Sequence, residues 1–157
     1  MSAQLIFDTA PLGAIIRYSD GTPRPPYRYR RKLQAWERHN NRGRLVKKRA
    51  ATVVAQIAIP ASFTLHEGDF GSKAVIVLRV FRTFSTDSAL AFSVVEHPAA
   101  GSILVLDRPG DAGELVHVAQ HQQVADEWLS RHGYPNARLY EVTADEVAVG
   151  SGKGRAA

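Results

Sequence analysis

The middle of the chain carries five short segments rich in Val, Ile, Leu and Phe, and this pattern constrains the fold more than any other feature. Such residues favour strands, and Pro, Gly, Ser or Asp separate one segment from the next. The spacing predicts a largely antiparallel meander. The five predicted strands are residues 51–59, 63–66, 74–84, 89–95 and 103–107.

The segment 74–84, AVIVLRVFRTF, is apolar on both faces in its first half. Such a pattern is typical of a strand in the centre of a sheet that is covered on both sides. We therefore expect a central strand here. Arg79 and Arg82 are expected on opposite faces of it, near its exposed end.

Residues 27–40 are predicted to form an Arg-rich helix near the N-terminus, with Gly43 just beyond it as the stop. Tyr29, Leu33 and Trp36 fall at positions i, i+4 and i+7, so they form one narrow apolar stripe. We expect this stripe to pack on the sheet.

A second helix is predicted at 121–132, with Val124 and Trp128 on its buried side. It lies between two predicted strands, which gives a strand-helix-strand unit at the C-terminal end of the chain. The fold class is therefore α+β, with a mainly antiparallel sheet of about six to eight strands that carries two helices. The further predicted strands are residues 12–18, 115–119 and 137–142.

The chain has 157 residues, of which 45% are hydrophobic and 22% charged, as expected for one globular domain. It has no cysteine, which excludes disulfides and thiolate metal sites and favours a reducing cytoplasm. No basic leader is visible, and no apolar run approaches the about 20 residues needed to span a membrane. We expect a soluble cytoplasmic protein without a membrane partner, with one domain at 1–149 and a disordered tail at 150–157.

Charge is the most uneven property of the chain. Residues 17–49 hold twelve Lys and Arg against Asp20 and Glu37, a net charge of +10, whereas the rest of the chain carries −5. A basic segment on a mildly acidic body is typical of a surface that attracts an anionic partner.

This basic segment is the candidate functional site. Arginines on one helix face and the basic run beyond Gly43 suit a phosphate backbone, because a guanidinium group can hold phosphate through two hydrogen bonds. The sequence therefore predicts a non-catalytic nucleic-acid-binding protein, for DNA or RNA. The residues predicted to contact phosphates are Arg28, Arg31, Lys32, Arg38, Arg42, Arg44, Lys47, Lys48 and Arg49.

The aromatic residues of the same segment leave an alternative open. Tyr27, Tyr29 and Trp36 could stack on bases if they are exposed, but Tyr29 and Trp36 share the stripe with Leu33, so we expect both rings in the core. Arg-rich faces with an aromatic anchor are also typical of protein interfaces. The alternative function is therefore an adaptor or inhibitor that docks on an acidic surface of a protein complex, itself a candidate for handling nucleic acid. The oligomeric state stays open.

The histidines offer the only candidate metal or acid-base site. His117 and His121 lie four residues apart, with Glu114 or Glu127 as a candidate carboxylate. The valines beside His117 indicate a strand, however, and helical spacing then does not apply. No nucleophile, base and orienting group can be placed together, so we expect no enzymatic activity, no metal and no cofactor.

Overall fold

The structure is a computed structural model of the chain, and it describes residues 1–72 and 75–152. Within these residues it confirms the α+β class and a single domain with mostly antiparallel sheets. The elements in chain order are α1 (Ala3–Thr9), β1 (Ile15–Ser19), α2 (Arg30–Glu37), β2 (Asn41–Arg49), β3 (Thr52–Val54), β4 (Ile57–Ile59), β5 (Ser62–Ser72), β6 (Val75–Ser85), β7 (Ala91–Glu96), β8 (Ile103–Leu106), β9 (Leu115–Ala119), α3 (Gln122–Arg131), β10 (Arg138–Glu141) and α4 (Ala144–Gly152).

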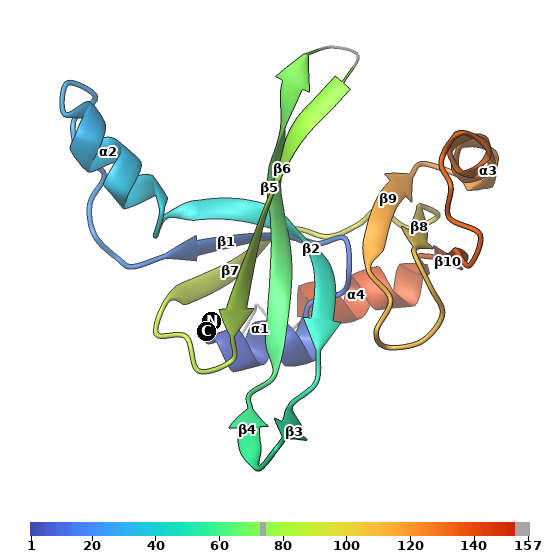
Figure 1. The fold of residues 1–157 in the computed structure, drawn as a ribbon, viewed down its shortest axis with the longest axis horizontal. Coiled ribbons are helices and arrows are strands. Elements are labelled where there is room, and N and C mark those ends of the chain that lie inside the picture. The colour runs from blue at the N-terminus through green and yellow to red at the C-terminus, as the bar shows by residue number, and fades with distance from the viewer. Residues whose placement is uncertain (73–74, 153–157) are drawn as a thin grey trace.

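The strands form three antiparallel sheets (Figure 1). The largest has five strands in the order β6-β5-β2-β1-β7, and α1 lies across one of its faces. A three-stranded sheet in the order β10-β8-β9 lies beside it with α3, and β3 and β4 form a separate two-stranded ribbon. None of the helices within the described residues is long and apolar enough to cross a membrane.

The main core lies between α1 and the inner face of the five-stranded sheet. Strand alternation turns Ile16 and Tyr18 of β1 toward this core, where both are fully buried. Their neighbours include Phe63, Phe84 and Phe92, with ring centroids 4.7 Å apart for Tyr18 and Phe84 and 5.4 Å apart for Phe63 and Phe92. Truncation of such a buried ring to alanine costs about 3–5 kcal/mol, so this aromatic cluster is a main source of stability.

A bulge in β2 joins the two larger sheets. The register of β2 against β5 shifts after Leu45, so consecutive residues of β2 serve different cores. Leu45 lies in the main core, whereas Val46 packs against Leu104, Leu115 and Val142 of the second unit. This shared cluster makes one domain of the two sheets.

The C-terminal unit of β9, α3 and β10 confirms the predicted strand-helix-strand arrangement. Strand β8 lies between β9 and β10 and pairs antiparallel with both. Ala125 of α3 is fully buried against Val105 and Ala119, and Val124 and Trp128 pack at the margin of this cluster, as expected.

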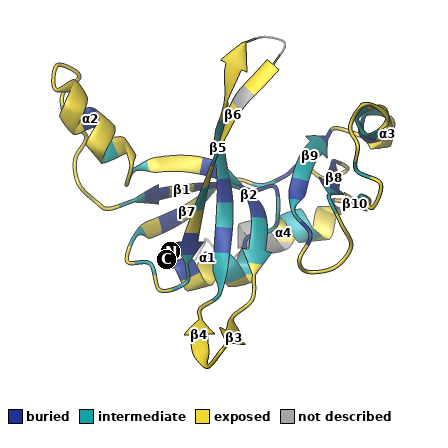
Figure 2. Ribbon diagram, in the orientation of Figure 1, coloured by how far each residue is buried: buried dark blue, intermediate teal, exposed yellow. Residues whose placement is uncertain are grey.

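The expectation that 74–84 is a central strand is wrong. Strand β6 is the edge of the five-stranded sheet, and its first half belongs to a projecting ribbon with β5 (Figures 1 and 2). Val75, Ile76 and Leu78 are each more than half exposed. An apolar pattern on both faces arises equally from burial and from a ribbon that presents apolar side chains to solvent, so the pattern alone does not separate the two.

The predicted single strand at 51–59 is also wrong, because the chain reverses within it. Ala55 and Gln56 have φ angles of 48° and 69°, and they form the turn between β3 and β4. Neither residue is of a type that ordinarily marks a left-handed turn, so no residue pattern indicates the reversal.

Gly43 does not stop a helix. Helix α2 ends at Glu37, and Gly43 lies within β2, where a Cβ atom would come 2.8 Å from the carbonyl oxygen of His66 on β5. The glycine is thus explained by the close approach of two strands rather than by a helix end.

Two helices were not predicted. Ser2 begins α1, since its hydroxyl accepts a hydrogen bond from the backbone N–H of Leu5 at 3.2 Å. Helix α4 extends to Gly152, so it includes the first residues of the predicted tail 150–157, and residues 153–157 lie outside the described part of the chain.

Candidate nucleic-acid interface

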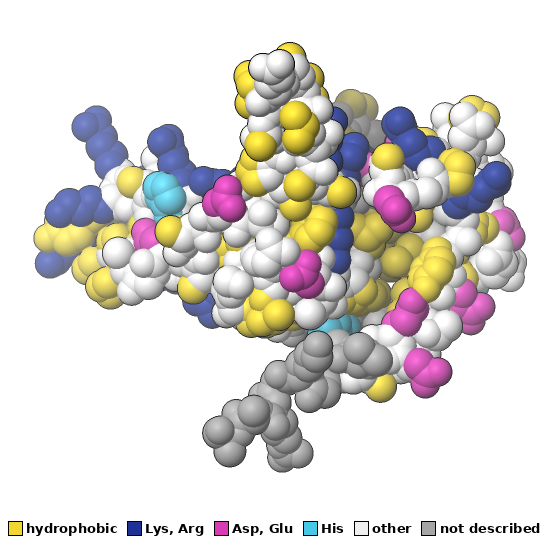
Figure 3. Space-filling view, turned by 90° about the horizontal axis from the view of Figure 1, so that it is seen from below, with side chains coloured by type: hydrophobic (Ala, Val, Ile, Leu, Met, Phe, Trp, Pro, Cys, Tyr) yellow, Lys and Arg dark blue, Asp and Glu magenta, His cyan; other side chains and the backbone are white. Residues whose placement is uncertain are grey.

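Residues 20–40, called the basic arm below, leave the five-stranded sheet between β1 and β2 and extend away from the body of the molecule (Figure 1). Six of these residues are Lys or Arg, and two are acidic. Figure 3 shows Lys and Arg side chains projecting at the end of the molecule where α2 lies. The arm therefore presents its positive charge clear of both larger sheets.

The base of the basic arm is fixed by hydrogen bonds. The Asp20 carboxylate accepts from the Thr22 hydroxyl at 2.6 Å, the Thr22 backbone N–H at 2.9 Å and the Asn40 amide at 2.9 Å. These bonds, those from Thr22 above all, lower the pKa of Asp20 to about 2. On the other side of the base, the Arg82 guanidinium of β6 donates to the carbonyl oxygen of Arg38.

The aromatic stripe of α2 does not pack on a sheet, contrary to expectation. Leu33 is buried, but Tyr29 is 43% exposed and Tyr27, just before the helix, is 77% exposed. Trp36 is half-buried, and its indole N–H donates to the carbonyl oxygen of Thr22 at 2.9 Å, within the arm itself. Two tyrosine rings are thus accessible from solvent.

Cationic groups of the basic arm lie over these rings. The Arg28 guanidinium is 4.8 Å from the centroid of Tyr29, and the Lys32 ammonium is 5.3 Å from the same ring. Arg24 lies 5.6 Å from the centroid of Tyr27. Cation–π contacts of this kind hold exposed cations near flat aromatic faces, so the arm presents positive charge and aromatic surface side by side.

The structure brings only part of the predicted site together. Arg28, Arg31, Lys32 and Arg38 are all exposed on the basic arm. Arg42 is exposed on β2, where it lies directly opposite another exposed arginine, Arg17 of β1. Like charges opposite each other on neighbouring strands are unfavourable without a counter-ion, so this pair extends the anion-attracting surface beyond the arm.

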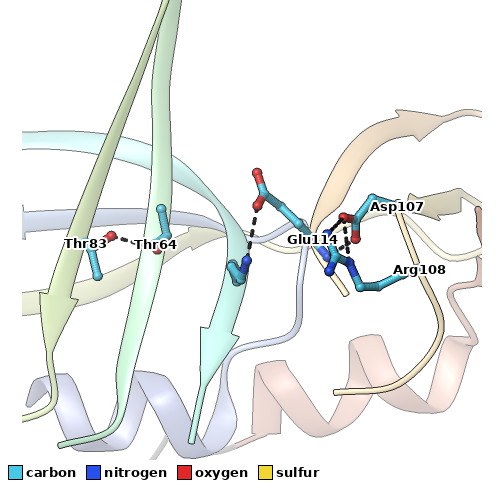
Figure 4. Close-up of polar contacts among 6 residues, drawn as sticks. Thr64, Thr83, Asp107, Arg108 and Glu114 are labelled. Atoms are coloured by element: carbon cyan, nitrogen blue, oxygen red, sulfur yellow. Dashed lines mark hydrogen bonds and ion pairs between the residues drawn. The ribbon is translucent and has the colours of Figure 1, made fainter. Parts of the chain in front are cut away.

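The remaining predicted residues lie along β2, away from the arm, and two of them have partners in other loops. Arg44 donates to the carbonyl oxygen of Gly13 at 2.7 Å. Lys47 forms an ion pair of 3.4 Å with Glu114 (Figure 4). Arg49 is exposed at the far end of β2.

Lys48 has a structural role in the body of the molecule. Its ammonium group donates to the carbonyl oxygen of Phe7 in the last turn of α1 at 2.6 Å and lies 5.7 Å from the centroid of the Phe7 ring. Burial lowers the pKa of Lys48, although the nearby Asp8 carboxylate opposes this shift. The cation thus compensates the negative end of the α1 dipole.

A cleft lies between the outer face of the five-stranded sheet and the loop that joins β8 to β9, and many of its polar side chains pair with one another (Figure 4). The Thr64 and Thr83 hydroxyls share a hydrogen bond of 2.8 Å across β5 and β6. On the opposite wall Arg108 pairs with Asp107 at 2.8 Å, and Asp107 accepts from the backbone N–H of Glu114 at 2.7 Å. These pairings leave less free positive charge here than on the basic arm.

The predicted pair of His117 and His121 does not form a site, because His117 instead packs on Trp128 together with His132. His117 lies in β9 and stacks on Trp128 with 4.7 Å between ring centroids, and His132 stacks on Trp128 at 4.0 Å. Burial, followed by the charge of His132, lowers the pKa of His117. His121 is exposed at the N-cap of α3, and no group of three His, Asp or Glu side chains in the described residues is placed to hold a metal ion.

One family model, described as Uncharacterised conserved protein UCP036055, matches residues 1–146. The chain belongs to this family. The match covers the basic arm, both larger sheets and the start of α4, so all the features above except the end of α4 fall within it. No curated protein and no solved structure matches the chain.

Several exposed cations of the candidate surface were not predicted from the sequence. Arg24 and Arg30 are exposed on the basic arm but were not among the predicted contacts. The density of positive charge in this segment could have indicated both residues. A helical wheel does not include Arg24, because Arg24 precedes the helix. Arg17 was missed because only strand pairing places it opposite Arg42.

Proposed function

We propose that the protein binds nucleic acid without catalysing a reaction, and that the basic arm is its contact surface. One observation carries the proposal: the arm holds six Lys and Arg side chains on a segment that extends from the body and presents two accessible tyrosine rings. Phosphates supply the counter-charge, and bases supply partners for the rings.

The charge of the arm is free to act on a ligand. Among the described residues, the ion pairs formed by Lys and Arg are those of Lys47, Arg79 and Arg108, all outside the basic arm. An arginine without an ion pair can bind phosphate at a lower cost in free energy, because it does not first have to break a bond to a carboxylate. The arm therefore suits an anionic polymer better than β2 does.

The proposal is tested by measuring the salt dependence of binding to fluorescent single-stranded and duplex oligonucleotides. Log affinity should fall linearly with log salt, by about 0.7 per neutralised phosphate on single strands and about 0.9 on duplex. Replacement of Arg31 and Arg38 by alanine should lower affinity for all sequences alike. It should also make the slope shallower by the amount that corresponds to about two phosphate contacts.

The matched control replaces two exposed arginines of the C-terminal unit, Arg131 and Arg138, by alanine. This control removes the same net charge but should leave most of the slope intact. Equal loss in both double variants, or no binding at low salt, would contradict the proposal.

A second candidate function is favoured by the two apolar ribbons. Val53, Val54 and Ile57 of β3 and β4 are each more than half exposed, as is Phe70 of β5. Two-stranded ribbons are marginally stable on their own, and exposed apolar patches mark protein interfaces. An adaptor or inhibitor would bind a protein that has an acidic surface beside an apolar patch. In a pull-down from a nuclease-treated lysate, the wild-type protein should then retain its partners, whereas the Val54→Asp variant should not.

A further inference from the structure

Strand β6 leaves one edge of the five-stranded sheet open. The two edges of this sheet are β6 and β7. At β7, Met1 covers part of the edge, because its amine donates to the carbonyl oxygen of Phe92 at 2.7 Å and its carbonyl oxygen accepts from the Phe92 N–H at 2.9 Å. Residues 75–80 of β6, in contrast, form backbone pairs only with β5 among the described residues (Figure 1). Their outward backbone groups are therefore available to another strand.

The side chains of this edge are also uncovered. Proteins ordinarily protect a sheet edge by a short strand, a charge, a proline or a covering element. Strand β6 has eleven residues, and its segment 75–78 contains neither a charge nor a proline. Val75, Ile76 and Leu78 are each more than half exposed (Figure 2). Ile76 lies opposite Gly71 of β5, so no cross-strand side chain packs against it within the ribbon.

We propose that two copies of the chain associate through this edge, with β6 of one copy antiparallel to β6 of the other. The inference is independent of the proposed nucleic-acid binding, because β6 and the basic arm share no residue. An antiparallel pair of identical strands has a two-fold axis, so each copy offers the other the same groups. A second copy is favoured over a foreign strand, because pairing of two β6 edges covers both, whereas a foreign strand would bring an outer edge of its own.

The charges of β6 permit this pairing. A two-fold axis midway between Ile76 and Leu78 sets Ile76 of each copy directly opposite Leu78 of the other, so that apolar side chains meet on one face. Arg79 lies one residue beyond Leu78, and the two Arg79 positions are then about 13 Å apart along the strands. Within its own copy, Arg79 also forms an ion pair of 3.4 Å with Asp69 of β5. The pairing therefore brings no like charges directly opposite each other.

The first test measures the mass of the full chain in solution by sedimentation equilibrium at micromolar concentration, where the wild-type protein should be a dimer. Ile76→Asp should raise the dissociation constant of the dimer at least about a hundredfold, because it places two carboxylates in the apolar contact. Leu78→Asp is the second variant if the first does not fold. The matched control is Val54→Asp, at a similarly exposed apolar position of the β3–β4 ribbon, and it should remain a dimer. A monomeric wild-type protein, or wild-type association in a folded Asp variant of β6, would overturn the proposal.

The second test uses cysteine cross-linking to determine the direction of the pairing. The chain has no cysteine, so a disulfide can form only between introduced residues. A mixture of Ile76→Cys and Leu78→Cys should form a covalent dimer faster than either variant alone. Directly opposite positions have Cα atoms about 4.5–5.5 Å apart, within the range of a disulfide, whereas identical positions lie on a diagonal of about 7–8 Å.

Val54→Cys is the control for random collision and should cross-link much more slowly than the mixture. Equal rates in the mixture and in this control would rule out the proposed pairing. Cross-linking of Ile76→Cys to a different protein in a lysate, without a disulfide between copies of the chain, would assign the edge to a foreign strand and also contradict the proposal.

Discussion

Helices α2 and α3 each carry one tryptophan on a narrow apolar stripe, but their surroundings differ. Trp128 of α3 stacks on both His117 and His132, on a helix whose Ala125 is fully buried against the three-stranded sheet. Trp36 of α2 packs on the loop of its own arm. The comparison teaches that an apolar stripe docks a helix only where a sheet offers it an apolar face, and that arginines around the stripe favour solvent.

Truncation of Trp128, the tryptophan that docks on a sheet, has the largest expected effect. Trp128→Ala should lower the free energy of unfolding by about 3 kcal/mol, because it removes a large ring and leaves His117 and His132 without their stacking partner. Urea denaturation followed by circular dichroism measures the change. A loss below about 1 kcal/mol would mean that α3 is not held by this ring.

The second test compares cations of the body with cations of the arm. Lys48→Met should cost about 1–2 kcal/mol of unfolding free energy, because the carbonyl group of Phe7 loses its charged donor. Arg31→Ala, an exposed position on α2, should stay within about 0.5 kcal/mol of wild type. Urea titrations of both variants under the same conditions measure these losses. Similar losses of unfolding free energy would mean that Lys48 has no greater structural role than Arg31.

Trp36→Ala truncates the tryptophan of the basic arm. We expect a loss of at most about 1 kcal/mol, since the half-exposed ring contributes mainly one hydrogen bond to Thr22. If the basic arm binds nucleic acid, this variant should lower the affinity for an oligonucleotide and leave the melting temperature nearly unchanged. A loss as large as that of Trp128→Ala would show that α2 is part of the core.

The smallest expected effect is a pH dependence confined to the α3 side. The pKa of His117 is lowered in the folded state, so the unfolded chain takes up a proton more readily, and stability is full above about pH 6.5 and falls as pH decreases. Between about pH 7.5 and about pH 5.5 the melting temperature of wild type should fall by about 1 °C more than that of His117→Phe, because the ring is largely screened by solvent. An equal fall in both proteins would assign the effect to other groups.

Strand and helix segments of the C-terminal unit could be predicted from sequence because their side chains bury where the periodicity places them. Val124, Ala125 and Trp128 face the core that the pattern indicates. The same reasoning failed for β6, whose apolar first half is exposed, because periodicity reports polarity and not which surface covers it. The turn at Ala55 and Gln56 could not be seen, since its backbone conformation is imposed against residue preference.

The candidate site was predictable as a charged segment but not as a surface. Charge density identified the arginines of the arm, yet the sequence does not say that Arg44 bonds to Gly13 or that Lys48 bonds to Phe7. Those contacts depend on elements far along the chain or on a helix that was not expected.

The bulge at Val46 couples local unfolding of the two larger sheets. Adjacent residues of one strand belong to two cores, so separation of either sheet must disturb the same few backbone hydrogen bonds of β2. The amides of β2 and of β8 should therefore exchange with solvent in a single concerted event rather than in two independent ones. The basic arm has no residue in either cluster, and its amides are free to exchange ahead of both.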